Sequence, residues 1–415
     1  MTATKPRPPA VSVLEVLLND DLVGTLTHVP DERTIWAFDP AYADDRERPT
    51  LSLSFKDASG GGLVTRDRPS HVTLPPFFSN LLPEGPLRGY LAARGPVNPE
   101  REFFLLWLLS EDLPGAVRVR PPAGQELPPS AAAAHPDDPE PADRMFRFSL
   151  AGIQLKFSAV AEAHGGLTIP VTGVGGTWIA KLPSTSYAAV PENEYVMLEL
   201  ARAAGVTAPE ARLVPLTDLR GLPAGAFAGT GRALAVRRFD RGPGGIRIHM
   251  EDFAQVFGQY PADKYGRASY EDIARVLWAE TGEPGVTELA RRLAVITLLG
   301  NADMHLKNWS VLYPNRRTPV LSPAYDMVST IPYIPEPELA LSLGETKSML
   351  EVDEDRFRRF AKRAGLPDRI VVAAARDATE RLREAWRTHP ATDLLPRFIR
   401  DAVSAHLDRA PLGRG

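Results

Sequence analysis

Polar side chains that could carry chemistry are concentrated in one short segment, GNADMHLKNWS, residues 300–310, directly after the apolar run LAVITLL. Asp303 and Asn308 lie five positions apart in this segment, in the pattern D-x-x-x-x-N. At this spacing, one carboxylate can face an attacking hydroxyl group while the amide oxygen reaches a metal ion. Asp326 follows a short apolar strand in a second segment, LSPAYDMVST, and can supply an anionic metal ligand.

A lysine within an apolar strand adds a second part of the same chemistry. Lys181 lies in the middle of TWIAKLP, flanked by Ile179 and Leu182, so its ammonium group needs an anionic partner. Glu194, in the helix predicted over PENEYVMLELARAAG, can provide that partner. Phosphoryl transfer from ATP uses such a lysine to neutralise phosphate charge, often with a glutamate that holds it.

Phosphoryl transfer also needs backbone N–H groups around the phosphates. The turn SLAGIQLK, residues 149–156, lies between two predicted strands ahead of Lys181, where a loop covering the phosphates is expected. A second glycine-rich stretch, GVGG at residues 173–176, is interpreted as a hairpin turn.

Each of these residues also has an ordinary structural interpretation. Lys181 can be a surface lysine, Glu194 a first-turn helix acid and His305 a structural histidine. Their order along the chain decides between the two interpretations. It runs from the loop to the lysine, the glutamate, the D-x-x-x-x-N pattern and the distal aspartate, and this order favours phosphoryl transfer.

The composition excludes several other classes of protein. The chain has 415 residues, of which 44% are hydrophobic, so it can bury the cores of two or three domains. A formal net charge of -4 provides no broad basic surface for direct binding of nucleic acid. Cysteine is absent, and so are the motifs of Walker ATPases, serine hydrolases and zinc proteases. No signal peptide or membrane-spanning run is predicted, which favours a cytoplasmic protein with no membrane partner.

The pattern of apolar and turn-forming residues predicts the elements that position these groups. Residues 11–55 are predicted as short strands, including LSLSF at residues 51–55, and helices are predicted from Glu84 and over residues 101–111. The segment 121–144 is rich in proline, alanine and acid, and we predict a mobile linker there. From His249 onward the pattern is almost entirely helical, except around residues 308–330.

We therefore predict an α+β fold, in which a two-lobed, protein-kinase-like core follows an N-terminal mixed α/β subdomain. The predicted boundaries are residues 1–120 for this subdomain, 121–144 for the linker, 145–240 for a β-rich lobe and 241–415 for a helical lobe. The β-rich lobe would carry the phosphate loop and Lys181. The helical lobe would carry Asp303, Asn308 and Asp326.

Nearly the whole chain resembles the HipA family of serine/threonine kinases, which are the toxins of HipBA-type toxin–antitoxin systems. The N-terminal motifs DLVGTL, WAFDPAYADD and FFSNLLPEG are similar to the family's N-terminal subdomain. The motifs SLAGIQLKFS, WIAKLP, VRRFDR and MEDFAQVFG are similar to its kinase core. The string G-N-x-D-x-H-x-K-N-x-S followed by Y-D is specific to the family.

The resemblance implies a role for each matching residue. Asp303 corresponds to the catalytic aspartate, Asn308 and Asp326 to the magnesium ligands, and Ser149 to the autophosphorylated serine. The residues implied to bind ATP are Ala151, Gly152, Ile153, Gln154, Leu155, Lys156, Lys181, Arg237, Phe239, His305, Asn308, Tyr325 and Asp326.

The family resemblance also implies a reaction and partners. The reaction would be transfer of the γ-phosphoryl group of ATP, with Mg²⁺, to a protein hydroxyl. The target would be a component of translation such as an aminoacyl-tRNA synthetase, and autophosphorylation would inactivate the toxin. A small helix-turn-helix antitoxin of HipB type would bind the chain, and DNA would be reached only through that partner. Two alternatives stay open: a small-molecule phosphotransferase, and a pseudokinase scaffold or transcription co-repressor with a DNA-binding partner.

Overall fold

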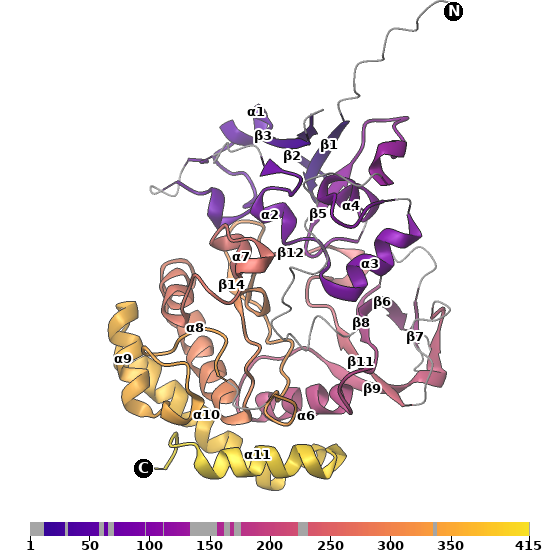
Figure 1. The fold of residues 1–415 in the computed structure, drawn as a ribbon. Coiled ribbons are helices and arrows are strands. Elements are labelled where there is room, and N and C mark those ends of the chain that lie inside the picture. The colour runs from indigo at the N-terminus through magenta and orange to yellow at the C-terminus, as the bar shows by residue number, and fades with distance from the viewer. Residues whose placement is uncertain are drawn as a thin grey trace, which may run out of the picture. The chain divides into compact units, whose positions relative to one another are not determined.

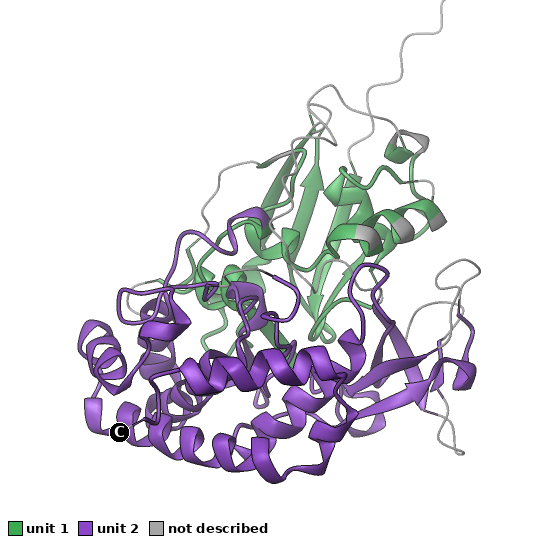
Figure 2. Cartoon of the chain, turned by 60° about the horizontal axis from the view of Figure 1, so that its bottom comes forward, with its two compact units in different colours: residues 1–146, 249–261 green, residues 147–248, 262–415 purple. Residues whose placement is uncertain are grey.

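The computed structural model describes residues 12–29, 32–57, 62–64, 70–95, 97–110, 112–132, 156–161, 167–169, 176–222, 231–334 and 338–414. The chain divides into two compact units, shown in different colours in Figure 2. Unit 1 comprises residues 1–146 and 249–261, and unit 2 comprises residues 147–248 and 262–415. Each unit has its own sheet and its own helices.

Unit 1 is built on an antiparallel sheet (Figure 1). Its described strands are β1 (Ser12–Leu18), β2 (Asp21–His28), β3 (Arg33–Phe38), β4 (Ser70–His71) and β5 (Val117–Arg120), in the order β4-β3-β2-β1-β5. Alternate residues of β1, such as Leu14 and Val16, are fully buried, as expected for a strand with one face on the core. The prediction of short strands from residue 11 onward is therefore confirmed for SVLEVLL in β1 and DLVGTLTH in β2.

Helices of unit 1 pack on the same core. Those described in the first 120 residues are α1 (Pro40–Asp44), α2 (Pro76–Ser79), α3 (Gly85–Arg94) and α4 (Glu102–Leu108), and α1, α2 and α4 contribute aromatic side chains to the core. Phe77, Phe78, Phe103 and Phe104 all lie within this core. The carboxylate of Glu102 is buried with them and accepts hydrogen bonds from Leu74 N (2.9 Å), the Ser79 hydroxyl (3.1 Å) and the Arg88 guanidinium (3.2 Å).

Residues 51–55, predicted as a strand, instead contain a 3₁₀ turn over Leu53–Phe55. The reason lies in Ser52, whose hydroxyl accepts a hydrogen bond from Ser54 N (3.1 Å) and so caps the turn. The same hydroxyl lies 2.5 Å from the Glu251 carboxylate, which also accepts from Leu53 N (2.9 Å). Local capping and a distant carboxylate thus override the alternating pattern.

Residues 249–261 belong to unit 1, although the helical pattern assigned them to the helical lobe. They form β12 (His249–Asp252) and α7 (Phe253–Val256). Buried polar contacts hold them there: the imidazole of His249 bonds to Leu51 O (2.7 Å), and the Gln255 amide donates to Phe77 O (2.9 Å). Part of the expected linker is also packed, because Ala131 is fully buried and accepts from Asn98 N (2.8 Å).

Unit 2 begins with a second sheet, whose described strands run in the order β10-β7-β6-β8-β11-β9. Their bounds are β6 (Lys156–Ala161), β7 (Leu167–Thr168), β8 (Trp178–Lys181), β9 (Ala211–Pro215), β10 (Leu219–Arg220) and β11 (Arg232–Arg237). Helix α6 (Val190–Ala203) packs against β9 and β11. It ends just before Gly205, the last residue of the predicted helical stretch PENEYVMLELARAAG, whose positive φ of 85° allows Val206 N to donate back to Ala201 O.

The rest of unit 2 is helical and gathers around α8 (Tyr270–Leu299), as Figure 1 shows. Helices α9 (Glu354–Ala364), α10 (Asp368–Thr388) and α11 (Arg397–Arg409) all contact it, and the short strands β13 (Ser310–Tyr313) and β14 (Val320–Leu321) pair beside it. Helix α8 bends at Gly282, two residues before Pro284. No helix in the described parts of the chain is long and apolar enough to cross a membrane.

Candidate functional site

The candidate site lies within unit 2, where Lys181 is held between two carboxylates. Strand β8 places its ammonium group in the interior, and the residue is only 5% exposed. The ammonium group donates to Glu194 Oε1 from α6 and to Asp326 Oδ1 from the segment after β14. The predicted partnership between Lys181 and Glu194 is therefore present, and Asp326 completes it.

A second lysine reaches the same aspartate. Lys156 in β6 lies directly opposite Lys181 in the antiparallel register of β6 and β8. Its ammonium group lies 3.1 Å from Asp326 Oδ2 and 3.4 Å from Oδ1. Two like charges that face each other across a sheet repel, so the carboxylate between them is what makes the pair acceptable.

The protonation states follow from burial and from these charges. Burial alone would lower the pKa of Lys181, but the carboxylates of Asp326 and Glu194 outweigh it and hold this pKa above its ordinary value. Burial alone would raise the pKa of Asp326, but Lys156 and Lys181 outweigh it and hold this pKa well below its usual range. Lys181 is therefore a cation and Asp326 an anion at neutral pH.

The loop that carries Asp303 begins where α8 ends. Gly300 caps the helix with a φ of +67°, and a side chain there would also meet Ile331 at 2.6 Å. The next residue, Asn301, is buried and uses its amide twice. Its oxygen accepts from Asp303 N (3.0 Å), and its nitrogen donates to Asp326 O (3.3 Å). One side chain thus ties the backbone of Asp303 to the backbone of Asp326.

The other residues of this loop are arranged around Asp303. The Asn308 amide nitrogen donates to Asp303 O (2.7 Å), which closes the D-x-x-x-x-N segment into a compact turn. The Tyr265 hydroxyl donates to Asp303 Oδ1 (2.6 Å). His305 Nε2 lies 3.9 Å from the same carboxylate oxygen, and the His305 ring meets the Tyr265 ring edge-on at 4.9 Å.

Asp326 occupies a strained backbone position. Its φ of +52° is unusual for a residue with a side chain and identifies a conformation that the surroundings must enforce. Asn193, next to Glu194 in α6, contributes to that enforcement. Its fully buried amide donates to Ser329 O (2.9 Å) and accepts from Ser329 N (3.0 Å). The helix that carries Glu194 is therefore fastened to the segment that carries Asp326.

Arg237, implied to bind ATP, lies at the end of β11. The Arg237 side chain is exposed and pairs with Glu210 (3.3 Å). The neighbouring Arg238 is buried instead, forms a two-bond ion pair with Asp240 (2.8 and 2.9 Å), and also donates to the Ser158 hydroxyl (3.0 Å).

Phe239 and Tyr325, both predicted near the nucleotide, contact each other with ring centroids 5.6 Å apart. The Tyr325 hydroxyl donates to Lys307 O (2.8 Å), the residue before Asn308. Two predicted site residues from distant segments are thus brought together beside the loop of Asp303.

The oxygen atoms around this loop fit a magnesium ion that arrives with a nucleotide. Among the described residues, no group of three or more His, Cys, Asp or Glu side chains could hold a metal by themselves. Asp326 and Asn308 provide one carboxylate and one amide, and Mg²⁺ in nucleotide sites binds one or two such ligands plus phosphate oxygens and water. The Asn308 nitrogen is committed to Asp303 O, which leaves the Asn308 oxygen as the side-chain atom that could bind a metal ion.

Some predicted residues lie outside the described part of the chain. Ser149, Ala151, Gly152, Ile153, Gln154 and Leu155 belong to this group, and only Lys156 of the phosphate loop is described. Conversely, the sequence did not point to Asn301, Asn193 or Tyr265. For Asn301 a signal was available in the sequence, because an amide side chain directly after a helix-ending glycine can hydrogen-bond to the backbone of the loop that follows. Asn193 and Tyr265 interact with partners that are distant in the sequence, so no local signal identified them.

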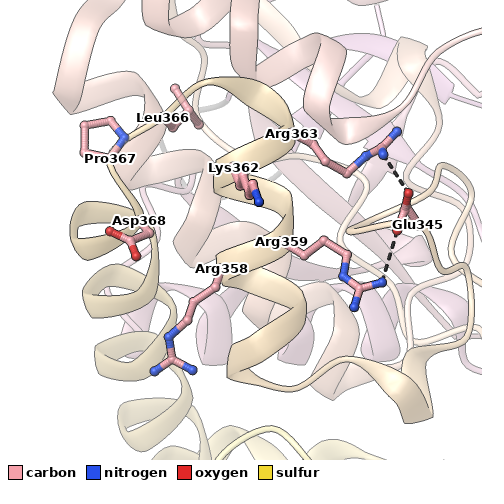
Figure 3. Close-up of a pocket in the computed structure, with 8 residues that line it drawn as sticks. All are labelled: Glu345, Arg358, Arg359, Lys362, Arg363, Leu366, Pro367 and Asp368. Atoms are coloured by element: carbon pink, nitrogen blue, oxygen red, sulfur yellow. Dashed lines mark hydrogen bonds and ion pairs between the residues drawn. The ribbon is translucent and has the colours of Figure 1, made fainter.

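A separate pocket lies beside α9 and contains none of these residues (Figure 3). Basic side chains of α9 line it, and three of them are held in ion pairs with acidic residues. Arg359 and Arg363 both pair with Glu345, at 3.1 and 2.6 Å, as the dashed lines in Figure 3 show. Arg358 pairs with Asp355 at 2.5 Å. We therefore do not assign the site to this pocket.

Comparisons with known proteins identify the family of the chain. The family model "HipA-like C-terminal domain" matches residues 148–386, and the model "HipA N-terminal domain" matches residues 14–120. A protein of Sinorhizobium fredii named "Putative kinase Y4dM" is 50% identical over 409 residues, which cover 98% of this chain and 99% of the relative. A second protein of that organism, "Putative kinase Y4mE", is 32% identical over 390 residues and 86% of each chain.

One solved structure shows the fold. The HipA chain of Shewanella oneidensis MR-1, from a complex with HipB and operator DNA, matches with a TM-score of 0.73 over 96% of both chains, at 21% identity. The α+β, HipA-like fold predicted from the sequence is thereby confirmed.

Proposed function

The chain belongs to the HipA family, and we propose that it is a protein serine/threonine kinase that transfers the γ-phosphoryl group of ATP to a protein hydroxyl. One observation carries this proposal: a buried lysine lies between a helix glutamate and a distal aspartate, and Asn301 links that aspartate to the loop of Asp303. A lysine in such surroundings suits phosphate binding better than a purely structural role, because Asp326 stays anionic beside it.

In the proposed reaction, Asp303 orients the substrate hydroxyl and accepts its proton late. The hydroxyl oxygen forms a bond to the γ-phosphorus, the bond from that phosphorus to the β–γ bridging oxygen breaks, and ADP leaves. Lys181 and Lys156 offset charge on the phosphates, and Glu194 holds Lys181 in place. Mg²⁺, held by Asp326 and Asn308, would neutralise further negative charge that develops on the phosphate oxygens.

The test compares acceptors as well as variants. The purified chain is incubated with labelled Mg-ATP and a general protein acceptor, and in parallel with aminoglycosides as small-molecule acceptors. We expect label on protein alone, and none with the Asp303→Asn variant. Label on the small molecules only would support the alternative phosphotransferase. Mg-ATP binding without any transfer would support the pseudokinase scaffold.

We also propose a protein partner of HipB type. The Shewanella HipA was solved with HipB and operator DNA, and this chain shares its fold. With a net charge of -4, the chain alone has little electrostatic attraction for DNA, so DNA would be reached through a small helix-turn-helix partner. The measurement is a gel shift at about 150 mM salt, where counterion release weakens non-specific binding. A shift caused by the isolated chain would contradict the proposal.

The protein target and the inactivation step complete the proposal. We propose a component of translation, such as an aminoacyl-tRNA synthetase, as the target, and Ser149 as the site of autophosphorylation. A phosphate on Ser149 adds about -1.5 to -2 charges at neutral pH and would repel the phosphates of ATP. Mass spectrometry after incubation with Mg-ATP, with Ser149→Ala as the control, tests the second part. Phosphate found only on other residues would contradict it.

A further inference from the structure

We propose that Tyr265 is a positioning residue of this enzyme, which holds the carboxylate of Asp303 in the orientation needed to receive the substrate proton. The inference rests on the proposed kinase function. It goes beyond that function because Tyr265 lies outside the loop and outside every motif that indicated the site. The tyrosine is a partly buried residue between the turn Pro261–Asp263 and helix α8.

Two contacts of Tyr265 and one of the preceding residue fasten this segment to the loop of Asp303. Its hydroxyl donates to Asp303 Oδ1 at 2.6 Å, and its ring meets the His305 ring edge-on. The preceding residue, Lys264, accepts a backbone hydrogen bond from Leu306 N at 3.2 Å. The backbone of Lys264 thus holds the loop at Leu306, and the side chain of Tyr265 holds it at Asp303 itself.

The geometry suits the control of a carboxylate. An O–H donor to an ionised oxygen forms a short, charge-assisted hydrogen bond, about twice as strong as a neutral one. Asp303 is only 3% exposed, so little water competes for the same oxygen. The bond resists rotation of the carboxylate about its Cβ–Cγ bond. A base can accept a proton only when its oxygen lies within hydrogen-bonding distance of the hydroxyl group, so the rotation of its carboxylate must be restrained.

The alternative is that the hydroxyl merely stabilises the fold of the loop. Tyr270 provides a matched control for this alternative, because its hydroxyl donates to Met304 O at 3.0 Å, in the same loop but not at Asp303. Met304 O also accepts from the Trp309 indole at 3.2 Å, so it keeps a donor when the Tyr270 hydroxyl is removed. Each Tyr→Phe variant removes one oxygen atom and keeps the ring.

The experiment measures kcat for protein phosphorylation, the KM for ATP, and the calorimetric affinity for Mg-ATP in three full-length proteins: wild type, Tyr265→Phe and Tyr270→Phe. Misplacing a reacting group by about 1 Å can cost 10²-fold in rate. For Tyr265→Phe we therefore expect kcat to fall at least about 10-fold, with KM and Mg-ATP affinity unchanged. For Tyr270→Phe we expect kcat close to that of the wild type.

Each outcome has a distinct meaning. A Tyr265→Phe variant with wild-type kcat, or one in which Mg-ATP affinity falls as much as kcat, would overturn the positioning role and leave the kinase function standing. An equal loss of kcat in both tyrosine variants would also overturn it, in favour of a general stabilising role. A wild-type protein without any transfer dependent on Asp303 would overturn the proposed function, and this inference with it.

Discussion

The ammonium group of Lys156 lies 3.1 Å from Oδ2 of Asp326, which follows it by 170 positions in the chain. Together with Lys181, it surrounds the proposed magnesium ligand with two positive charges. A divalent cation that binds Asp326 must therefore replace the two lysine ammonium groups as the partner of the Asp326 carboxylate oxygens. Nucleotide phosphates make this exchange possible, because they give both lysines new anionic partners as the metal arrives.

Asp326→Asn should weaken Mg-ATP binding by at least about 10-fold, since the substitution removes the anionic ligand from a site built only of oxygen atoms. Asn308→Ala should weaken it less, because an amide oxygen carries no net charge. Isothermal titration calorimetry of both variants with Mg-ATP is the measurement. Unchanged affinity in both would leave Asp326 a structural residue, important only as the partner of Lys156 and Lys181.

Asp303→Asn should abolish most of the phosphoryl transfer but leave the fold intact. The loss of a positioned base commonly costs about 10²–10⁴-fold in rate. An amide has nearly the same shape as a carboxylate, and its oxygen can still accept from the Tyr265 hydroxyl. The thermal midpoint should therefore change little. A variant that retains more than half of the wild-type rate would show that Asp303 has been assigned wrongly.

Asn193→Leu should lower both stability and nucleotide binding. The substitution leaves the buried Ser329 N–H and carbonyl groups without the partner that they share. Each unsatisfied buried group costs about 1–3 kcal/mol. Because Asn193 also fastens α6 to the segment of Asp326, we expect a lower denaturant midpoint together with weaker Mg-ATP binding. A loss of stability with wild-type affinity would show that the fastening is not needed to hold Asp326.

The residues that the sequence identified share one property: their chemistry is visible in a short stretch. Lys181 is conspicuous within an apolar strand, and Asp303 and Asn308 define a spacing. Asn301 and Tyr265 are different, because polar residues beside loops are common. Their importance depends on partners 25 and 38 positions away. Such a pairing follows from the tertiary fold. For Tyr265 local patterns contain no information on it, whereas for Asn301 the helix-ending glycine before it was a local signal.

The same distinction applies to the fold. Strands with one buried face were predictable from alternation, and the end of α6 was predictable from Gly205. The segment 249–261 was not, because its apolar and helix-forming residues suit either unit. Its placement in unit 1 depends on Glu251 and His249, which bond to residues about 198 positions earlier. A buried acid and a buried histidine in one short strand were the available signal.

The buried His249 makes the stability of unit 1 depend on pH. Burial lowers the pKa of His249 from 6.5 to about 4, against the opposing effect of its hydrogen bond to Leu51. The unfolded chain therefore takes up a proton as the pH falls below about 6.5, whereas the folded unit does not until about 4, so stability is lost across this window. Between pH 7 and pH 5 the loss should be about 2 kcal/mol.

His249→Gln is the matched variant, since a glutamine amide can still donate to Leu51 O and has no proton to gain. Urea unfolding at several pH values, followed by pulse hydrogen exchange of peptides from β1 and β2, reports on this unit. The wild type should lose about 2 kcal/mol more than the variant between pH 7 and pH 5. Parallel pH dependences in the two proteins would show that the folded chain protonates His249 as readily as the unfolded chain does. Glu251, two positions along the same strand, would then be the first residue to test as the group that stabilises the protonated imidazole.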